Sequence, residues 1–206
     1  MARTIVSAGT TLAMLLGMCA AAAAQDNLFK DFTYGSPQKA YTEAKGFYDC
    51  TEYVGAAAMC KDDVDFNGEK FSLALFFSDA KLTTVSLVSR FDQDLYASAL
   101  GALRQSLTLV AMSDGKTQLD LFELKWRSPG QEDYAARLSS YERAGAKSGD
   151  FTYTFLEGVD VRSNYPSMSA MLSASVRSIR AAELLLTGQG EDAGVVINFS
   201  RQGGRR

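Results

Sequence analysis

The sequence predicts an α+β domain in which helices pack mainly on one face of an antiparallel sheet. Two observations carry this prediction. Apolar residues alternate with small or polar residues in short runs joined by tight turns, which is typical of antiparallel hairpins. Longer segments place apolar residues along one helical face, and they do not alternate strictly with strands as crossover helices of a parallel sheet would.

The first expected element is a helix that runs from Pro37 to Lys45. The Ser36 side chain can cap its first turn, and proline is favourable at the first helical position. Gly46 follows the last expected helical residue, where glycine commonly ends a helix.

The clearest strand pattern covers residues 71–77. Its alternating apolar residues are Phe71, Leu73, Leu75 and Phe77. A tight turn at residues 78–81 leads into a second strand, Leu82–Phe91, so the pair is expected to form an antiparallel hairpin. The Asn67-Gly68 pair is typical of a two-residue turn and predicts a further hairpin that leads into the first of these strands.

The rest of the chain is expected to contain further helices and strands. A helix capped by Asp92 reaches about Leu109, and its core-facing residues are Leu95, Ala99, Leu103 and Leu107. The other expected elements are a strand at Thr117–Arg127, a helix at Gln131–Ala146, a strand at Phe151–Leu156, a helix at Pro166–Thr187 and a strand at Val195–Ser200. The Leu184–Leu186 run leaves open that part of the last helix is a strand.

The first 24 residues have the pattern of a cleaved secretory signal peptide. Arg3 precedes an apolar stretch, and small residues lead to a cleavage point after Ala24. A retained anchor and lipidation at Cys19 are the alternatives, but Met18 stands where a lipoprotein motif has a small residue. The prediction is therefore a signal peptide over residues 1–24, a single α+β domain over 25–200 and a disordered basic tail over 201–206.

Removal of the signal peptide leaves two of the three cysteines, Cys50 and Cys60. In the periplasm or outside the cell, two thiols separated by nine residues are expected to form a structural disulfide. The chain-entropy model gives such a loop about 2–3 kcal/mol of stabilisation. Free or redox-active thiols are the alternative, although redox pairs typically have the closer Cys-x-x-Cys spacing.

The chain contains no histidine, which excludes Ser-His-Asp and Cys-His catalysis and the common histidine-containing zinc sites. Carboxylate-pair hydrolysis, a Ser-Lys pair and calcium binding remain open. The Asp63–Gly68 segment matches the first half of a calcium loop, but Ala74 stands where the loop needs a bidentate glutamate. Ser36 and Lys39 match a Ser-x-x-Lys pattern, which the expected helix cap explains better.

Charge and aromatic content bear on the partner. The formal net charge of −3 offers no electrostatic attraction to nucleic acid, and no apolar run after the signal is long enough to span a membrane.

Aromatic residues can form a recognition surface or pack on half-buried strands. The residues in question are Tyr48, Tyr53, Trp126, Tyr134, Tyr141, Tyr153 and Tyr165. The carboxylates Glu123, Glu132, Asp133, Glu142 and Glu157 form no pair that the sequence places in one cleft.

The first half of the chain resembles a known kind of exported domain. Its motifs are, in order, a Gly35-Ser36-Pro37 helix start, the two cysteines, Phe66-Asn67-Gly68, and the hairpin turn Phe77-Ser78-Asp79-Ala80-Lys81-Leu82. This order is similar to that of small exported bacterial domains of the BamE-like and β-lactamase-inhibitor-protein-like type. The resemblance covers about Phe32–Val110 and implies a non-catalytic role in envelope assembly, protein binding or inhibition. The Gln131–Ala146 helix is not part of the pattern.

These observations predict an exported, non-catalytic domain that binds another protein or an envelope component in the periplasm or outside the cell. No catalytic residue, cofactor or metal ligand is predicted. The alternative is a small hydrolase that uses carboxylates or a Ser-Lys pair. A carrier of apolar ligands is a third hypothesis and needs an apolar cavity between the sheet and the helices. A binding domain should instead present aromatic side chains on the open face of the sheet.

Overall fold

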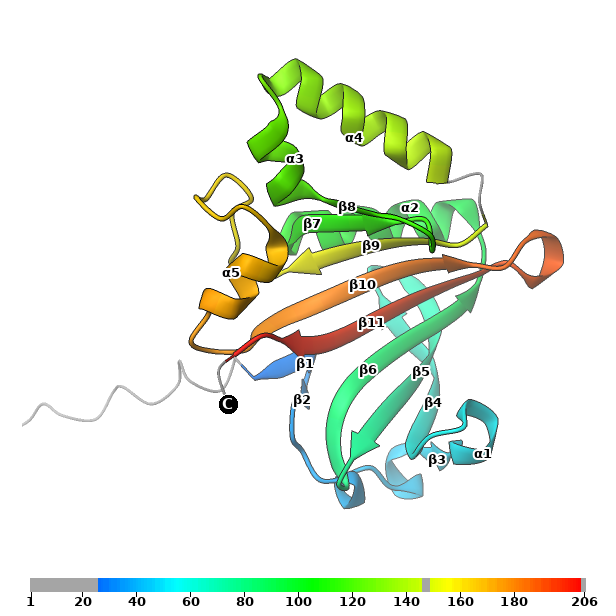
Figure 1. Cartoon of the computed structure of the whole chain (residues 1–206). Coiled ribbons are helices and arrows are strands. Elements are labelled where there is room, and N and C mark those ends of the chain that lie inside the picture. The colour runs from blue at the N-terminus through cyan, green and yellow to red at the C-terminus, as the bar shows by residue number, and fades with distance from the viewer. Residues whose placement is uncertain (1–25, 146–148, 205–206) are drawn as a thin grey trace, which may run out of the picture.

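The computed structural model describes residues 26–145 and 149–204 (Figure 1). The predicted signal peptide and Cys19 lie outside the described residues. Within the described ranges, no helix is both long and apolar enough to cross a membrane.

A nine-stranded antiparallel sheet forms the centre of the fold, in the order β3-β4-β5-β6-β11-β10-β9-β7-β8. Its strands are β3 (Tyr48–Asp49), β4 (Ala58–Phe66), β5 (Glu69–Ser78), β6 (Lys81–Arg90), β7 (Thr108–Ser113), β8 (Gln118–Asp120), β9 (Phe151–Leu156), β10 (Ile179–Thr187) and β11 (Gly194–Gln202). A separate two-stranded sheet pairs β1 (Asn27–Phe29) with β2 (Phe32–Thr33). Figure 1 shows a strong twist, because β4–β6 run steeply across the view whereas β7 and β9 lie nearly horizontal.

Helices of various lengths connect the strands. The α-helices are α1 (Thr51–Val54), α2 (Gln93–Ser106), α3 (Leu121–Arg127), α4 (Gln131–Gly145) and α5 (Met168–Ala174), and the 3₁₀ turns are η2 (Gln38–Ala40), η3 (Glu43–Lys45) and η4 (Gly190–Asp192). The predicted α+β class is confirmed. The predicted cap is also confirmed, because the Asp92 carboxylate accepts hydrogen bonds from the backbone amides of Asp94 and Leu95.

Both predicted hairpins are present. β5 pairs with β6, and β4 pairs with β5 through a two-residue turn at Asn67-Gly68. Both turn residues have positive φ, 53° and 87°, as a type I′ hairpin turn requires. The strand predicted at Phe151–Leu156 forms with the same bounds as β9.

The helix predicted at Pro37–Lys45 is wrong. The segment forms two 3₁₀ turns, because the backbone amide of Gln38 donates to the carbonyl of Ala80 and so ties the segment to the β5–β6 turn. The Ser36 hydroxyl makes no cap. It bonds the Thr33 carbonyl and the Tyr41 hydroxyl instead.

Three further predictions need correction. The strand predicted at Thr117–Arg127 is only β8, since the Asp120 carboxylate caps α3 and starts a helix there. The helix predicted at Pro166–Thr187 is short, and the Leu184–Leu186 run lies in β10. β11 continues to Gln202, so the first two residues of the predicted disordered tail belong to the sheet, where the Arg201 guanidinium donates to Ser178.

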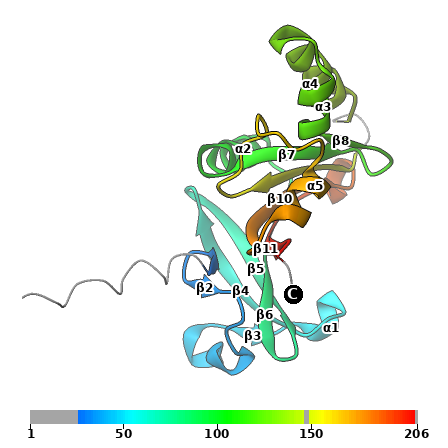
Figure 2. The same cartoon turned by 60° about the vertical axis from the view of Figure 1, so that its left-hand side comes forward.

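The central sheet separates two apolar cores. Adjacent strand residues point to opposite faces, and accordingly Phe155 belongs to the larger core whereas Leu156 belongs to the smaller one. Leu95 and Leu103 of α2 pack in the larger core, and Phe122 of α3 packs in the smaller core with α5. Figure 2 shows α2 and α5 on opposite sides of the sheet. Packing of the helices mainly on one face is therefore not confirmed.

Candidate functional site

A single row of paired residues crosses the sheet on the face opposite α2. Residues paired directly across antiparallel strands point to the same face. Thr154 of β9 pairs with Glu183 of β10, Glu183 with Asn198 of β11, and Asn198 with Ser86 of β6. These four residues are called the polar row. The row continues to Asp120 on the β8 side and to Cys60 on the β4 side.

Other elements cover both ends of this row. At one end, the Asp120 carboxylate caps α3 and accepts a 2.7 Å hydrogen bond from the backbone amide of Met168 in α5. At the other end, Cys60 forms the predicted disulfide with Cys50, which precedes α1. Figure 2 shows α1 and α5 on the same side of the sheet. The middle of the face, over β10, β11 and β6, lies between these two covered ends.

An apolar row runs beside the polar row. Leu185 of β10 pairs with Val196 of β11, which pairs with Val88 of β6. None of the three belongs to either core, and 42% of the Val88 surface is exposed. The polar and apolar rows together are called the open strip. Within it Val88 is exposed, Glu183, Leu185, Val196 and Asn198 are half-buried, and Thr154 and Ser86 are buried. The apolar residues of the strip are aliphatic, so the aromatic patch expected on the open face of a binding domain is not on the strip.

The polar row contains one ionisable side chain, that of Glu183. The Ser86 hydroxyl donates to the Asn198 side-chain oxygen at 2.5 Å. The Glu183 carboxylate has no hydrogen bond or ion pair with any other residue that the structure describes. Burial raises the pKa of Glu183, because partial removal from water disfavours the charged carboxylate.

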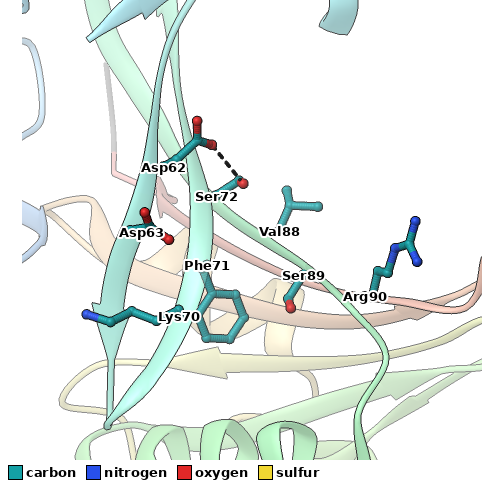
Figure 3. A pocket seen from close by; sticks show the side chains of 8 residues that line it. All are labelled: Asp62, Asp63, Lys70, Phe71, Ser72, Val88, Ser89 and Arg90. Atoms are coloured by element: carbon teal, nitrogen blue, oxygen red, sulfur yellow. Dashed lines mark hydrogen bonds between the residues drawn. The ribbon is translucent and has the colours of Figure 1, made fainter. Parts of the chain in front are cut away.

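A shallow depression of about 360 Å³ adjoins the strip at Val88 (Figure 3). In Figure 3, the Asp62, Ser72 and Val88 side chains lie on the same side of β4–β6. The Asp62 carboxylate accepts hydrogen bonds from the Ser72 hydroxyl at 3.0 Å and from the Tyr48 hydroxyl at 3.2 Å. The Asp62 carboxylate therefore already has hydrogen-bond partners. The depression extends the surface of the strip beyond Val88.

A second hollow of about 670 Å³ lies by the β10–β11 hairpin, where Phe91, Tyr96 and Leu186 line it together with several glycines. The Tyr96 hydroxyl bonds the Tyr153 hydroxyl at 2.8 Å, and Tyr153 donates to the Glu142 carboxylate at 2.9 Å. Burial raises the pKa of Tyr153, so this phenol stays protonated. The network ties α2 and α4 to β9.

The sequence-predicted catalytic patterns do not converge in the structure. Ser36 is hydrogen-bonded to Thr33 and Tyr41, with no lysine among its partners. Four of the flagged carboxylates form ion pairs, which are Glu123 with Arg127, Asp133 with Arg137, Glu142 with Arg104, and Glu157 with Arg180. The first half of the calcium-loop pattern lies in the β4–β5 hairpin. Over the described ranges, no three His, Cys, Asp or Glu side chains form a group that could hold a metal ion.

The flagged aromatic residues divide by environment. Tyr53 and Trp126 are strongly exposed, at 92% and 66%, and Tyr48 and Tyr165 are also exposed. Tyr134 and Tyr141 are half-buried, and Tyr153 is buried in the larger core. Tyr48 pairs with Cys60 at the β4 end of the polar row, whereas Tyr153 lies on the opposite face of the sheet.

Comparison of the chain with protein families, curated proteins and solved structures finds no match. The resemblance to BamE-like and β-lactamase-inhibitor-protein-like domains therefore stays a prediction.

Sequence reasoning missed the open strip, and Glu183 in particular. The prediction of a helix over Pro166–Thr187 removed the strand pattern that places Glu183 and Leu185 on one face. A usable signal was present. Glu183 is the one charged residue in the apolar run from Ala181 to Leu186, and strand periodicity would have placed it beside Leu185.

Proposed function

We propose that this protein is an exported, non-catalytic domain that binds another protein or an envelope component through the open strip. The observation that carries the proposal is the apolar row, because Leu185, Val196 and Val88 lie outside both cores and are half-buried or exposed. Rows of this kind, bordered by polar groups, are typical of interaction sites. The disulfide supports a location in the periplasm or outside the cell.

The energetics indicate how large the contact must be. Full burial of one valine or leucine side chain contributes about 1.5–3 kcal/mol, and these three are already partly buried. Association itself costs at least about 4 kcal/mol. The strip is therefore the centre of a larger contact that extends onto its borders. Other exposed apolar side chains of the described residues include Tyr53 and Val54 of α1 and Val176 after α5.

The test is affinity capture from an envelope extract with the oxidised protein as bait. The strip variant is Leu185→Asp combined with Val196→Asp, and the matched control is Ala97→Asp on the exposed side of α2. Circular dichroism verifies that each bait is folded. We expect one or more components to be retained by the parent and by the control, and to be lost with the strip variant.

Equal retention by all three baits would contradict binding through the strip. Turnover of screened esterase, peptidase or glycosidase substrates by the purified protein would contradict the non-catalytic role and favour the hydrolase alternative.

A further inference from the structure

Glu183 carries a carboxylate at a position where no other described residue of the fold stabilises its charge. It lies in the middle of β10, and the neighbouring residues Ala182 and Leu184 are completely buried on the other face. A partly buried carboxylate without a partner destabilises the fold, because it loses hydration and receives no hydrogen bond in return. Residues that break a local rule in this way commonly serve function.

No lysine or arginine of the described residues forms an ion pair with Glu183. On its own face it is bordered by Thr154, Asn198 and Leu185, none of which carries a charge. The nearest arginines along these strands are Arg180, three residues from Glu183 in β10, and Arg201, three residues from Asn198 in β11. Because side chains alternate along a strand, both arginines point to the opposite face. Arg180 pairs there with Glu157 and contacts the Leu28 carbonyl, and Arg201 pairs with Asp26.

The cation on the same face of β10, β11 and β6 is Arg90, which is also too far away. Arg90 pairs with Gly194, which is four residues along β11 from Asn198. Four residues of a strand span about 13 Å, well beyond the reach of an ion pair. The open strip therefore presents an unneutralised negative charge directly beside an apolar row.

The backbone of the strip limits the form of the partner. β10, β11 and β6 are hydrogen-bonded to neighbours on both sides, so the strip is a sheet face and offers no free edge for strand addition. A segment that lies on such a face must satisfy its own backbone groups, as a helix does. From β10 to β6 the strip measures two strand spacings, about 10 Å, which matches the diameter of one helix.

We propose that the open strip binds an amphipathic helix of a partner protein, with a lysine or arginine of that helix paired to Glu183 and its apolar side chains packed on Leu185, Val196 and Val88. Glu183 and Leu185 are two strand residues apart, about 6.7 Å. Helix residues at i and i+4 have a similar separation, about 6 Å, so the basic residue and one apolar residue occupy these positions. This inference rests on the proposed function, because it concerns the same strip.

The test uses four synthetic helical peptides with the same leucine stripe and a single variable position beside it, occupied by Lys, Arg, Gln or Glu. Each is titrated into the oxidised protein and into Glu183→Gln, with binding measured by fluorescence anisotropy. The matched control is Glu191→Gln, which removes the same charge from an exposed site in η4. We expect the Lys and Arg peptides to bind the parent and the control about fivefold more tightly than the Gln peptide. Glu183→Gln should abolish this preference.

The outcomes separate this inference from the proposed function. Binding of all four peptides with equal affinity, lost in Leu185→Asp with Val196→Asp, would overturn the role of Glu183 while supporting the strip as a binding surface. Binding that the strip variant does not weaken would contradict both. Absence of measurable binding by the Lys and Arg peptides at millimolar concentration would overturn the inference. Glu183→Gln removes a charge that has no partner, so this variant is expected to stay folded. A loss of binding by it therefore reports on the charge and not on unfolding.

Discussion

The two faces of β10 place neighbouring leucines in opposite environments. Leu184 is completely buried in the larger core, where it lies between its paired residues Tyr153 and Ile197. Leu185 points to the other face, belongs to neither core and borders Glu183. The same residue type thus stabilises the fold at one position and lies in the proposed binding surface at the next. Strand periodicity alone produces the difference.

The face of the sheet that holds the larger core is packed with aromatic side chains. Its aromatic rings pack closely, with centroids 5.0 Å apart for Phe29 and Phe199 and 4.9 Å apart for Phe151 and Tyr153. The strip on the other face has hydroxyl, amide and carboxylate groups beside aliphatic side chains. Aromatic packing there would add stability, and its absence is consistent with a surface that selects a partner.

The largest expected effect tests the comparison directly. Leu184→Ala should lower the free energy of unfolding by about 3 kcal/mol, because it removes a fully buried side chain and leaves a cavity. Leu185→Ala should cost less than about 1 kcal/mol and should weaken binding through the strip. Urea unfolding followed by circular dichroism measures both values. Similar losses for the two variants would show that the faces contribute equally to stability.

The disulfide is expected to have the next largest effect. Replacement of Cys50 and Cys60 by serine should lower the free energy of unfolding by about 2–3 kcal/mol, because the unfolded chain gains the freedom of the loop between them. Urea unfolding of the variant and of the oxidised parent measures the difference. Reduction of the parent with dithiothreitol should reproduce the loss. An unchanged unfolding midpoint after verified reduction would contradict a structural role for the bond.

The smallest expected effect concerns Glu183. Its folded-state pKa is raised by burial, so the folded protein binds this proton more tightly than the unfolded chain does. Stability should therefore fall as pH rises from the ordinary glutamate pKa of about 4.3 through the raised folded value. Glu183→Gln should raise the free energy of unfolding at pH 7 by about 0.5 kcal/mol, and the gain should vanish at about pH 3.

Urea unfolding at the two pH values measures this change, and Glu191→Gln is the control that should alter neither value. Destabilisation by Glu183→Gln at pH 7 would show that the carboxylate has a stabilising partner. Such a result would remove the contrast between the two faces at this residue.

Sequence reasoning succeeded where the deciding interactions are local. The Asn67-Gly68 turn, the Asp92 cap and the β5–β6 hairpin each depend on residues close in the chain. It failed at Pro37–Lys45, because a hydrogen bond from Gln38 to the distant Ala80 replaces the helix. It also failed at β10, whose neighbours are β9 and β11.

The sequence by itself determined the α+β class, the hairpins and the covalent link between two nearby cysteines, because short-range periodicity, turn chemistry and proximity in the chain suffice for these. Only the tertiary structure decided that the segment around Glu183 is a strand and that this residue faces the open strip. An apolar run such as Ala181–Leu186 is compatible with a helix or a strand. Pairing with β9 and β11 selects the strand, and its register then places every second side chain on the uncovered face.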